Sequence, residues 1–216
     1  MTEPLQAALF DFAGVMTEPF LGRSGRDQAP QTEAERQTRK GLWELLSGVT
    51  FGASDDHPWH QLETGRMELA EFVAWVDEQV PGGGARFDPQ QGEIPLSHLP
   101  MRTALIDEVR RLREAGVRTA LVTNNVREWR PVWSSRLPLD ELFDTVVDSS
   151  EVGHRKPEAE IYELTLGRLE VTADRAVFLD DMTANVEGAR AVGLHAIHVE
   201  EDTDAVIAEL RTLTGR

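Results

Sequence analysis

The chain has 216 residues, of which 40% are hydrophobic and 28% charged, and a formal net charge of −16. This length is sufficient to bury a sizeable core, and the negative charge argues against binding to nucleic acid or to an anionic membrane surface. Because the chain has no cysteine, disulfides and thiolate metal sites are excluded. No apolar segment has the length of a membrane span and no signal peptide is visible, so we expect a cytoplasmic protein.

Residues 5–10 form a short, nearly continuous apolar run, which predicts a buried strand. The run ends at Asp11, so this carboxylate is expected at the carboxyl end of the strand. In open α/β sheets, ligands bind at that edge. A carboxylate there can act as a nucleophile or as a metal ligand. The alternative is that Asp11 only caps the following turn.

Residues 17–95 predict a mostly helical unit inserted after the first strand. Helical apolar spacing covers residues 31–47 and 63–80, whereas Gly and Pro mark loops at 17–30 and 81–100. Three of the five tryptophans lie in this unit, at positions 43, 59 and 75. We expect them to pack in its core rather than to form a binding cage.

From residue 101 onwards, helical and strand patterns alternate. Strands are expected at 117–122, 143–147, 176–179 and 194–199, and helices at 102–115, 127–136, 158–169, 183–192 and 203–213. This alternation indicates βαβ units and a doubly wound, Rossmann-like parallel sheet, formed by residues 1–16 and 96–216. Right-handed crossovers bring the carboxyl ends of all the strands to one edge.

Polar side chains gather at the ends of these predicted strands. Thr123 and Asn124 follow one strand, Asp180 and Asp181 follow another, and Lys156 opens a helix after the neighbouring loop. Lysine is rare in this chain, with Lys40 the only other one among 22 basic residues, so a compact point charge is expected to matter at Lys156. Singly, each residue is compatible with a helix cap or a solvated charge. Together with Asp11 they indicate a site.

Four segments resemble, in order and spacing, the motifs of the haloacid dehalogenase-like superfamily. They are Phe10-Asp11-Phe12-Ala13-Gly14-Val15, Leu121-Val122-Thr123-Asn124, Lys156-Pro157, and Val177-Phe178-Leu179-Asp180-Asp181 followed by Asn185 and Gly188. The resemblance implies an α/β core with an inserted helical cap domain at 17–95. Within this cap, the segment Leu62-Glu63-Thr64-Gly65-Arg66 is similar to cap segments of one bacterial subgroup.

The resemblance also implies a Mg²⁺-dependent phosphatase that acts on a small phosphorylated metabolite. Asp11 would attack phosphorus and form an aspartyl-phosphate. Thr123, Asn124 and Lys156 would bind the phosphoryl oxygens, and Lys156 would offset the charge of the clustered carboxylates. The implied Mg²⁺ ligands are Asp11, Asp180, Asp181 and the backbone carbonyl of Ala13.

One position departs from the family pattern. Phosphatases of the family usually have a second Asp two residues after the nucleophile, and here that residue is Ala13. A general acid or base contributes about 10²- to 10⁴-fold to the rate. Two alternatives therefore stay open: a catalytically weak protein that binds a phosphorylated ligand, and a phosphonatase-like hydrolase in which Lys40 forms a Schiff base. The Asp180-Asp181 pair argues for a metal and against dehalogenation.

Other polar residues compete for a functional role. Asp55, Asp56, His57 and His60 are all potential metal ligands, but Pro58 interrupts helical spacing between the histidines, so we expect them to be structural or exposed. We also expect structural roles for His195 and His198. His154 and Arg155 precede Lys156 and are candidates to approach the pocket.

Overall fold

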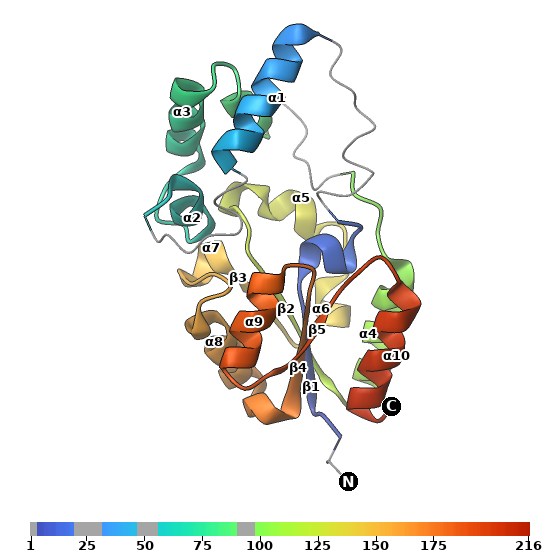
Figure 1. Ribbon diagram of the computed structural model, residues 1–216. Coiled ribbons are helices and arrows are strands. Elements are labelled where there is room, and N and C mark those ends of the chain that lie inside the picture. The colour runs from blue at the N-terminus through green and yellow to red at the C-terminus, as the bar shows by residue number, and fades with distance from the viewer. Residues whose placement is uncertain (1–3, 20–31, 47–55, 90–97) are drawn as a thin grey trace.

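The computed structural model describes residues 4–19, 32–46, 56–89 and 98–216. Its centre is a parallel sheet of five strands in the order β3-β2-β1-β4-β5, seen nearly edge-on in Figure 1. The strands are β1 (Ala7–Phe10), β2 (Arg118–Thr123), β3 (Thr145–Asp148), β4 (Ala176–Asp180) and β5 (His195–His198). The predicted parallel α/β core is confirmed, with strand bounds within about two residues of the prediction.

Helices cover both faces of the sheet (Figure 1). Alternate residues of a strand point to opposite faces, so Ala8 and Phe10 share one apolar cluster while Ala7 and Leu9 share the other. The first cluster includes α4 (Thr103–Glu114) and α10 (Thr203–Thr214), and the second includes α8 (Ala159–Leu169) and α9 (Thr183–Ala191). Burial on both faces explains why the strands are continuous apolar runs.

Short helices occupy several connections. They are η5 (Arg127–Trp129), α5 (Arg130–Ser134), α6 (Leu139–Leu142), α7 (Ser149–Val152) and η6 (Ala173–Arg175), whereas η1 (Phe12–Met16) is an irregular turn with non-helical backbone angles at two residues. Helices α6 and α7 lie where no helix was predicted, because four residues are too few to establish a period. No helix in the described parts of the chain combines the length and apolar character needed to cross a membrane.

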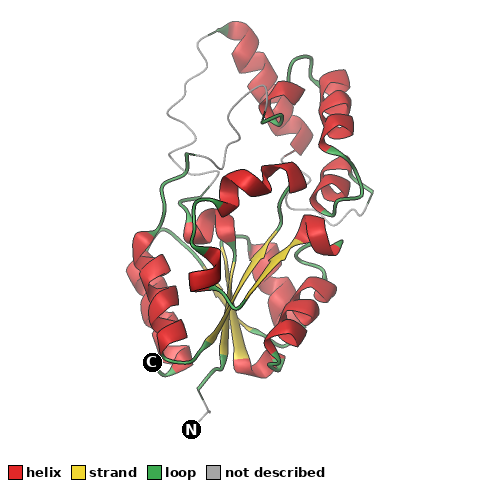
Figure 2. Ribbon diagram, turned by 180° about the vertical axis from the view of Figure 1, so that it is seen from behind, coloured by secondary structure: helices red, strands yellow, loops and turns green. Residues whose placement is uncertain are grey.

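The segment between β1 and α4 contains α1 (Glu33–Leu46), α2 (Pro58–Glu63), α3 (Leu69–Gln79) and η3 (Gly84–Arg86). Figure 2 shows these helices beyond the carboxyl edge of the sheet. The helix predicted for 63–80 is confirmed over Leu69–Gln79 as α3, but its predicted start is wrong, because α2 ends at Glu63. Gly65 then adopts a left-handed φ of 66°, and a capping box between Glu68 and Glu71 starts α3.

Aromatic side chains join this inserted segment to the rest of the protein. The indole of Trp129 in η5 stacks on Phe87 with 6.4 Å between centroids, and its Nε1 donates to the Phe87 carbonyl at 2.9 Å. Trp59 and Phe72 complete the cluster. Trp43, in contrast, was wrongly predicted to lie in a core and is 56% exposed.

The two connections to the inserted segment run side by side. Thr17 and Met101 form an isolated antiparallel bridge, and Glu18 N donates to the Pro100 carbonyl at 2.8 Å. The buried Arg102 guanidinium donates to the Thr17 carbonyl at 3.3 Å and to the Glu200 carbonyl at 2.9 Å. Both connections are thus attached near the carboxyl end of β5.

Candidate active site

A buried lysine joins two carboxylates at the carboxyl edge of the sheet. Lys156 Nζ lies 2.7 Å from Asp11 Oδ1 and 2.7 Å from Asp180 Oδ2. Asp11 directly follows β1 and Asp180 ends β4, its neighbour in the sheet. The Lys156 side chain is 1% exposed. Burial of an ammonium group is tolerated only with such close, hydrogen-bonded partners.

Asp181 adds a third carboxylate to this cluster. Oxygen atoms of Asp11, Asp180 and Asp181 all lie within 4.8 Å of one another. Three carboxylates therefore surround one ammonium group, and negative charge is in excess. Mg²⁺ prefers hard oxygen ligands, including one or two carboxylates. The donor set and the charge imbalance both fit a divalent cation of this kind.

The electrostatics of the cluster reflect the same excess of negative charge. Burial raises the pKa of Asp11 to about 8, against the opposing effect of Lys156 and with added repulsion from Asp180 and Asp181. Burial and the charge of Asp180 also raise the pKa of Asp181 to about 6. A bound cation favours the ionised carboxylates and would reverse both shifts.

Asp180 is oriented by a hydrogen-bond network behind the site. Its Oδ1 accepts from Met182 N at 2.8 Å, and Asn185 Nδ2 lies 3.1 Å from each of its carboxylate oxygens. The Tyr162 hydroxyl donates to the Asn185 carbonyl at 2.7 Å. Hydrogen bonds of this kind, made to a ligand from behind, orient metal ligands and catalytic carboxylates.

The turn after Asp11 is irregular. Ala13 has φ −77° and ψ 127°, and Gly14 has the left-handed φ of 84°. Gly14 N donates to Thr17 Oγ1 at 3.2 Å. A Cβ atom on Gly14 would overlap the Asp181 carboxylate. Glycine is therefore required here both by the backbone angle and by the lack of space.

Asn124 is bonded to the backbone of the lysine. Its Oδ1 accepts from Lys156 N at 2.8 Å and its Nδ2 donates to the Lys156 carbonyl at 2.9 Å. Asn124 thus positions Lys156, and its predicted contact with substrate stays a prediction. Thr123, the last residue of β2, is buried next to it.

His198 lies at the edge of the cluster. Its Nε2 is 2.9 Å from the Asp181 carbonyl. Asp181 and His198 both line a cavity of about 560 Å³, together with Pro19 and residues 199–202. His198, the last residue of β5, thus contacts the backbone that follows β4, and its expected structural role stays a prediction.

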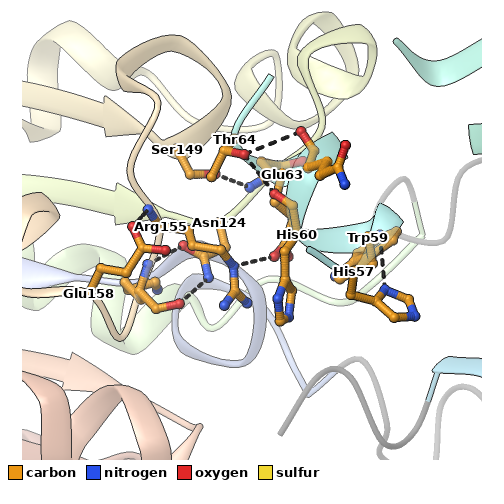
Figure 3. A network of polar contacts seen from close by, with 12 residues as sticks. His57, Trp59, His60, Glu63, Thr64, Asn124, Ser149, Arg155 and Glu158 are labelled. Carbon is orange, nitrogen blue, oxygen red and sulfur yellow. Dashed lines mark hydrogen bonds and ion pairs between the residues drawn. The ribbon is translucent and has the colours of Figure 1, made fainter. Parts of the chain in front are cut away.

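An ion pair that the sequence did not predict connects α2 to the lysine loop (Figure 3). Arg155 Nε donates to Glu63 Oε2 at 2.8 Å, and each of the two side chains is 8% exposed. The only sequence signals were the position of Arg155 before Lys156 and the Leu62–Arg66 segment. His154, the other candidate, is half-exposed and 3.9 Å from Glu158.

The remaining candidates lie elsewhere. Lys40, on α1, has a 70% exposed side chain and is 3.6 Å from Glu44, so it is not brought to the Asp11 cluster. His57 caps α2 by accepting from Trp59 N at 3.1 Å. Among the described residues, His57 and His60 belong to no group of potential metal ligands. Asp55 lies outside the described residues.

Comparison with known proteins places the chain in a family. Residues 5–193 match the haloacid dehalogenase-like hydrolases. The sesquiterpene phosphatase AstK of Aspergillus oryzae is 31% identical, and the match covers 100% of both chains. Mouse acyl-CoA dehydrogenase family member 10 is 38% identical over 80% of this chain, which spans only 17% of that protein.

Among solved structures, a HAD-family enzyme from Bacteroides thetaiotaomicron in complex with magnesium and inorganic phosphate has the same fold. Its TM-score is 0.64 and its sequence identity 20%, over 94% of this chain and 98% of that one. The family match covers most of the present chain. The protein therefore belongs to the haloacid dehalogenase-like hydrolases.

Proposed function

We propose that this hydrolase is a Mg²⁺-dependent phosphatase that acts on a small phosphorylated metabolite through an aspartyl-phosphate on Asp11. The observation that carries the proposal is the buried contact of Lys156 with Asp11 and Asp180, with Asp181 within 4.8 Å of both carboxylates. Full-length similarity to a sesquiterpene phosphatase supports a phosphatase, and the magnesium complex of a protein with the same fold supports the metal.

Asp11, Asp180, Asp181 and the Ala13 carbonyl would hold the metal ion. When bound, Mg²⁺ would neutralise the carboxylates and the phosphoryl oxygens, so that two anionic groups can approach each other. The Lys156 ammonium group would donate a hydrogen bond to an oxygen of the phosphoryl group. The Thr123 hydroxyl, at the end of β2, would donate another. Phosphoryl transfer requires mainly such positioning and charge stabilisation.

The Asp11 carboxylate oxygen would attack phosphorus in line with the ester oxygen. The new bond joins Asp11 Oδ to phosphorus, and the bond from phosphorus to the leaving alcohol breaks. Water then attacks the aspartyl-phosphate at phosphorus, which releases inorganic phosphate and restores the Asp11 carboxylate. Burial of Asp11 lowers its hydration, so its oxygen is more available for attack once the surrounding cations keep it ionised.

This mechanism lacks a side chain at position 13 that could protonate the leaving alcohol. At position 13 the side chain is a methyl group, so Ala13 donates no proton to the departing oxygen. A proton must then come from water, which favours leaving groups that are stable as anions. We therefore infer slow turnover of alkyl phosphates and faster turnover of substrates with acidic leaving groups.

Residues 17–95 would act as the cap domain over this site, with 1–16 and 96–216 as the core domain. The adjacent connections at Thr17 and Met101 make a compact hinge for such a unit. Closure of a cap excludes water and completes the contacts to substrate. Its pocket-facing side chains would select the metabolite.

The test is release of inorganic phosphate from a panel of phosphate monoesters, with Mg²⁺ and with EDTA. We expect turnover only with Mg²⁺, and loss of at least about 10³-fold in Asp11→Asn. Asp204→Asn, at an exposed position of α10, serves as the matched control. Turnover that survives EDTA or Asp11→Asn contradicts the proposal.

A second candidate, a protein that binds a phosphorylated ligand with little turnover, is favoured by Ala13. In that case, calorimetry would detect Mg²⁺-dependent binding of phosphate or BeF₃⁻ while all monoesters stay intact. Substantial turnover of any monoester excludes it.

A further inference from the structure

The ion pair between Arg155 and Glu63 is not explained by the chemistry proposed for Asp11. Glu63 ends α2, whereas Arg155 directly precedes Lys156, so the pair spans 92 positions of the sequence. The position of Arg155 is well defined, because its backbone N donates to Glu158 Oε2 at 3.1 Å and the next residue is bonded twice to Asn124. These hydrogen bonds fix the backbone from which the Arg155 side chain extends, next to the lysine that contacts Asp11.

The contact with Glu63 uses only part of the guanidinium. Nε donates to Glu63, and among the described residues no hydrogen-bond partner faces the two terminal Nη nitrogens of Arg155. Figure 3 shows these nitrogens pointing away from Glu63. A guanidinium has five donors in a rigid fork. Four N–H groups are therefore offered to a ligand or to water between α2 and the lysine loop.

Another arginine of this protein shows what a purely structural pair looks like. Arg111 binds Glu108 through both Nε and Nη2, at 2.9 and 2.5 Å, which is the two-pronged geometry typical of arginine and carboxylate. Arg155 is more deeply buried than Arg111, yet it forms one hydrogen bond with its carboxylate. Its Nη groups are thus left available to a ligand or to water, while most of the side chain is shielded from solvent.

We propose that Arg155, oriented by Glu63, forms a subsite for a second anionic group of the substrate, a carboxylate or a further phosphate on the leaving group. This inference rests on the phosphatase function proposed above. The fork of Nη donors matches paired oxygens of carboxylate and phosphate. Because Glu63 balances the charge of Arg155, recognition depends on directed hydrogen bonds more than on net charge.

The test compares alkyl monophosphates whose far end is a hydroxyl, a carboxylate or a second phosphate, with spacers of two to five carbon atoms. For wild-type protein with Mg²⁺, we expect kcat/KM to be about 10- to 100-fold higher for an anionic far end at the best spacer length. Arg155→Gln should abolish this preference, mostly through KM, so that kcat/KM for the anionic series falls to that for the hydroxyl series.

Three further variants separate recognition from folding. Arg155→Lys keeps the positive charge but loses the paired Nη donors of the guanidinium, so it should retain only part of the preference for an anionic far end. Glu63→Ala removes the acceptor that orients the Arg155 guanidinium, so it should weaken the preference although the charge of Arg155 stays. Arg66→Gln removes an exposed positive charge near α2 and should retain the full preference. Melting temperatures of all variants report whether folding is affected.

The outcomes separate the two proposals. Equal kcat/KM for the three end groups in wild type, or an equal loss for all of them in Arg155→Gln, overturns the subsite and assigns the pair a structural role. If wild type hydrolyses none of the compounds or other monoesters, the phosphatase proposal fails instead. A preference for the carboxylate over the second phosphate, or the reverse, identifies which anion the subsite accepts.

Discussion

Gly14 and Asp181 lie so close together that a methyl group on the glycine would overlap the carboxylate of the aspartate. Gly14 belongs to the turn that follows Asp11, and Asp181 follows β4. The turn after the first strand and the acidic end of β4 are therefore packed directly against each other. This contact places a carboxylate from each strand end in one small cluster, and it would make the proposed cation binding depend on the shape of a backbone turn.

Gly14→Ala is expected to damage the metal site beyond its effect on the backbone. Gly116→Ala is a matched control, since Gly116 has nearly the same φ (83°, against 84°) but no atom within 4 Å of the added methyl. Each substitution should cost roughly 1–2 kcal/mol for a left-handed non-glycine residue. Only Gly14→Ala should also lose most of the increase in melting temperature that Mg²⁺ produces. A full Mg²⁺ response in Gly14→Ala would contradict this coupling.

The sheet and the clustering of its polar residues were predictable because each strand is a short apolar run that ends in polar residues. Ala7–Phe10 and Ala176–Asp180 are almost purely apolar because helices bury both of their faces, and parallel topology then brings Asp11 and Asp180 to one edge. The Glu63–Arg155 pair was not predictable in this way. It depends on how α2 packs over the lysine loop, and no periodicity relates residues 92 positions apart.

The metal-free protein should lose stability as pH rises, because of Asp11. The pKa of Asp11 is raised by burial to about 8 in the folded protein, against an ordinary value of 3.8. Between these two pH values, Asp11 is protonated in the folded state but ionised in the unfolded state. Its protonation therefore contributes fully to the free energy of unfolding below about pH 4, and this contribution is lost as pH rises towards 8. Mg²⁺ requires the ionised carboxylates, so its stabilising effect should grow over the same range.

The measurement is the melting temperature from pH 5 to pH 8.5, in EDTA and in Mg²⁺. Asp11→Asn should show a flatter pH dependence in EDTA and a smaller Mg²⁺ effect at pH 8. Asp204→Asn, which alters an exposed residue of α10, should behave as wild type. The interpretation fails if Asp11→Asn and wild type share the same slope in EDTA.

Glu108 is expected to stabilise the packing of α4 against α10. Its carboxylate is 2% exposed and accepts from Arg111 Nε at 2.9 Å and from Arg211 Nη2 at 2.7 Å. Burial alone would raise the pKa of Glu108, but hydrogen bonds and charge from Arg111 and Arg211 outweigh it, so the pKa is lowered from 4.5. The contribution is therefore present above about pH 4.5 and is lost as pH falls below it.

Glu108→Gln should consequently lower the free energy of unfolding by about 1–3 kcal/mol at pH 7, and by less at pH 3.5. Urea unfolding at the two pH values measures both quantities. Glu114→Gln, at an exposed position of the same helix, should change stability by less than about 0.5 kcal/mol. An equal loss at both pH values would show that packing, and not the ionised carboxylate, is responsible.

Ala13→Asp should supply the proton donor that the turn lacks. The position lies two residues after Asp11, where phosphatases of the family usually have their second Asp, so a carboxyl group there is expected to reach the departing oxygen. For wild type, kcat should fall steeply as the leaving group becomes less acidic, from nitrophenyl to alkyl phosphates. In Ala13→Asp this dependence should flatten, with about 10²-fold faster turnover of alkyl phosphates and little change for nitrophenyl phosphate. Ala13→Asn matches the new side chain in size but cannot act as an acid, so it should keep the steep dependence of wild type. If Ala13→Asp gains no more than Ala13→Asn, proton transfer at this position does not limit the reaction, and the small residue is compatible with full catalysis.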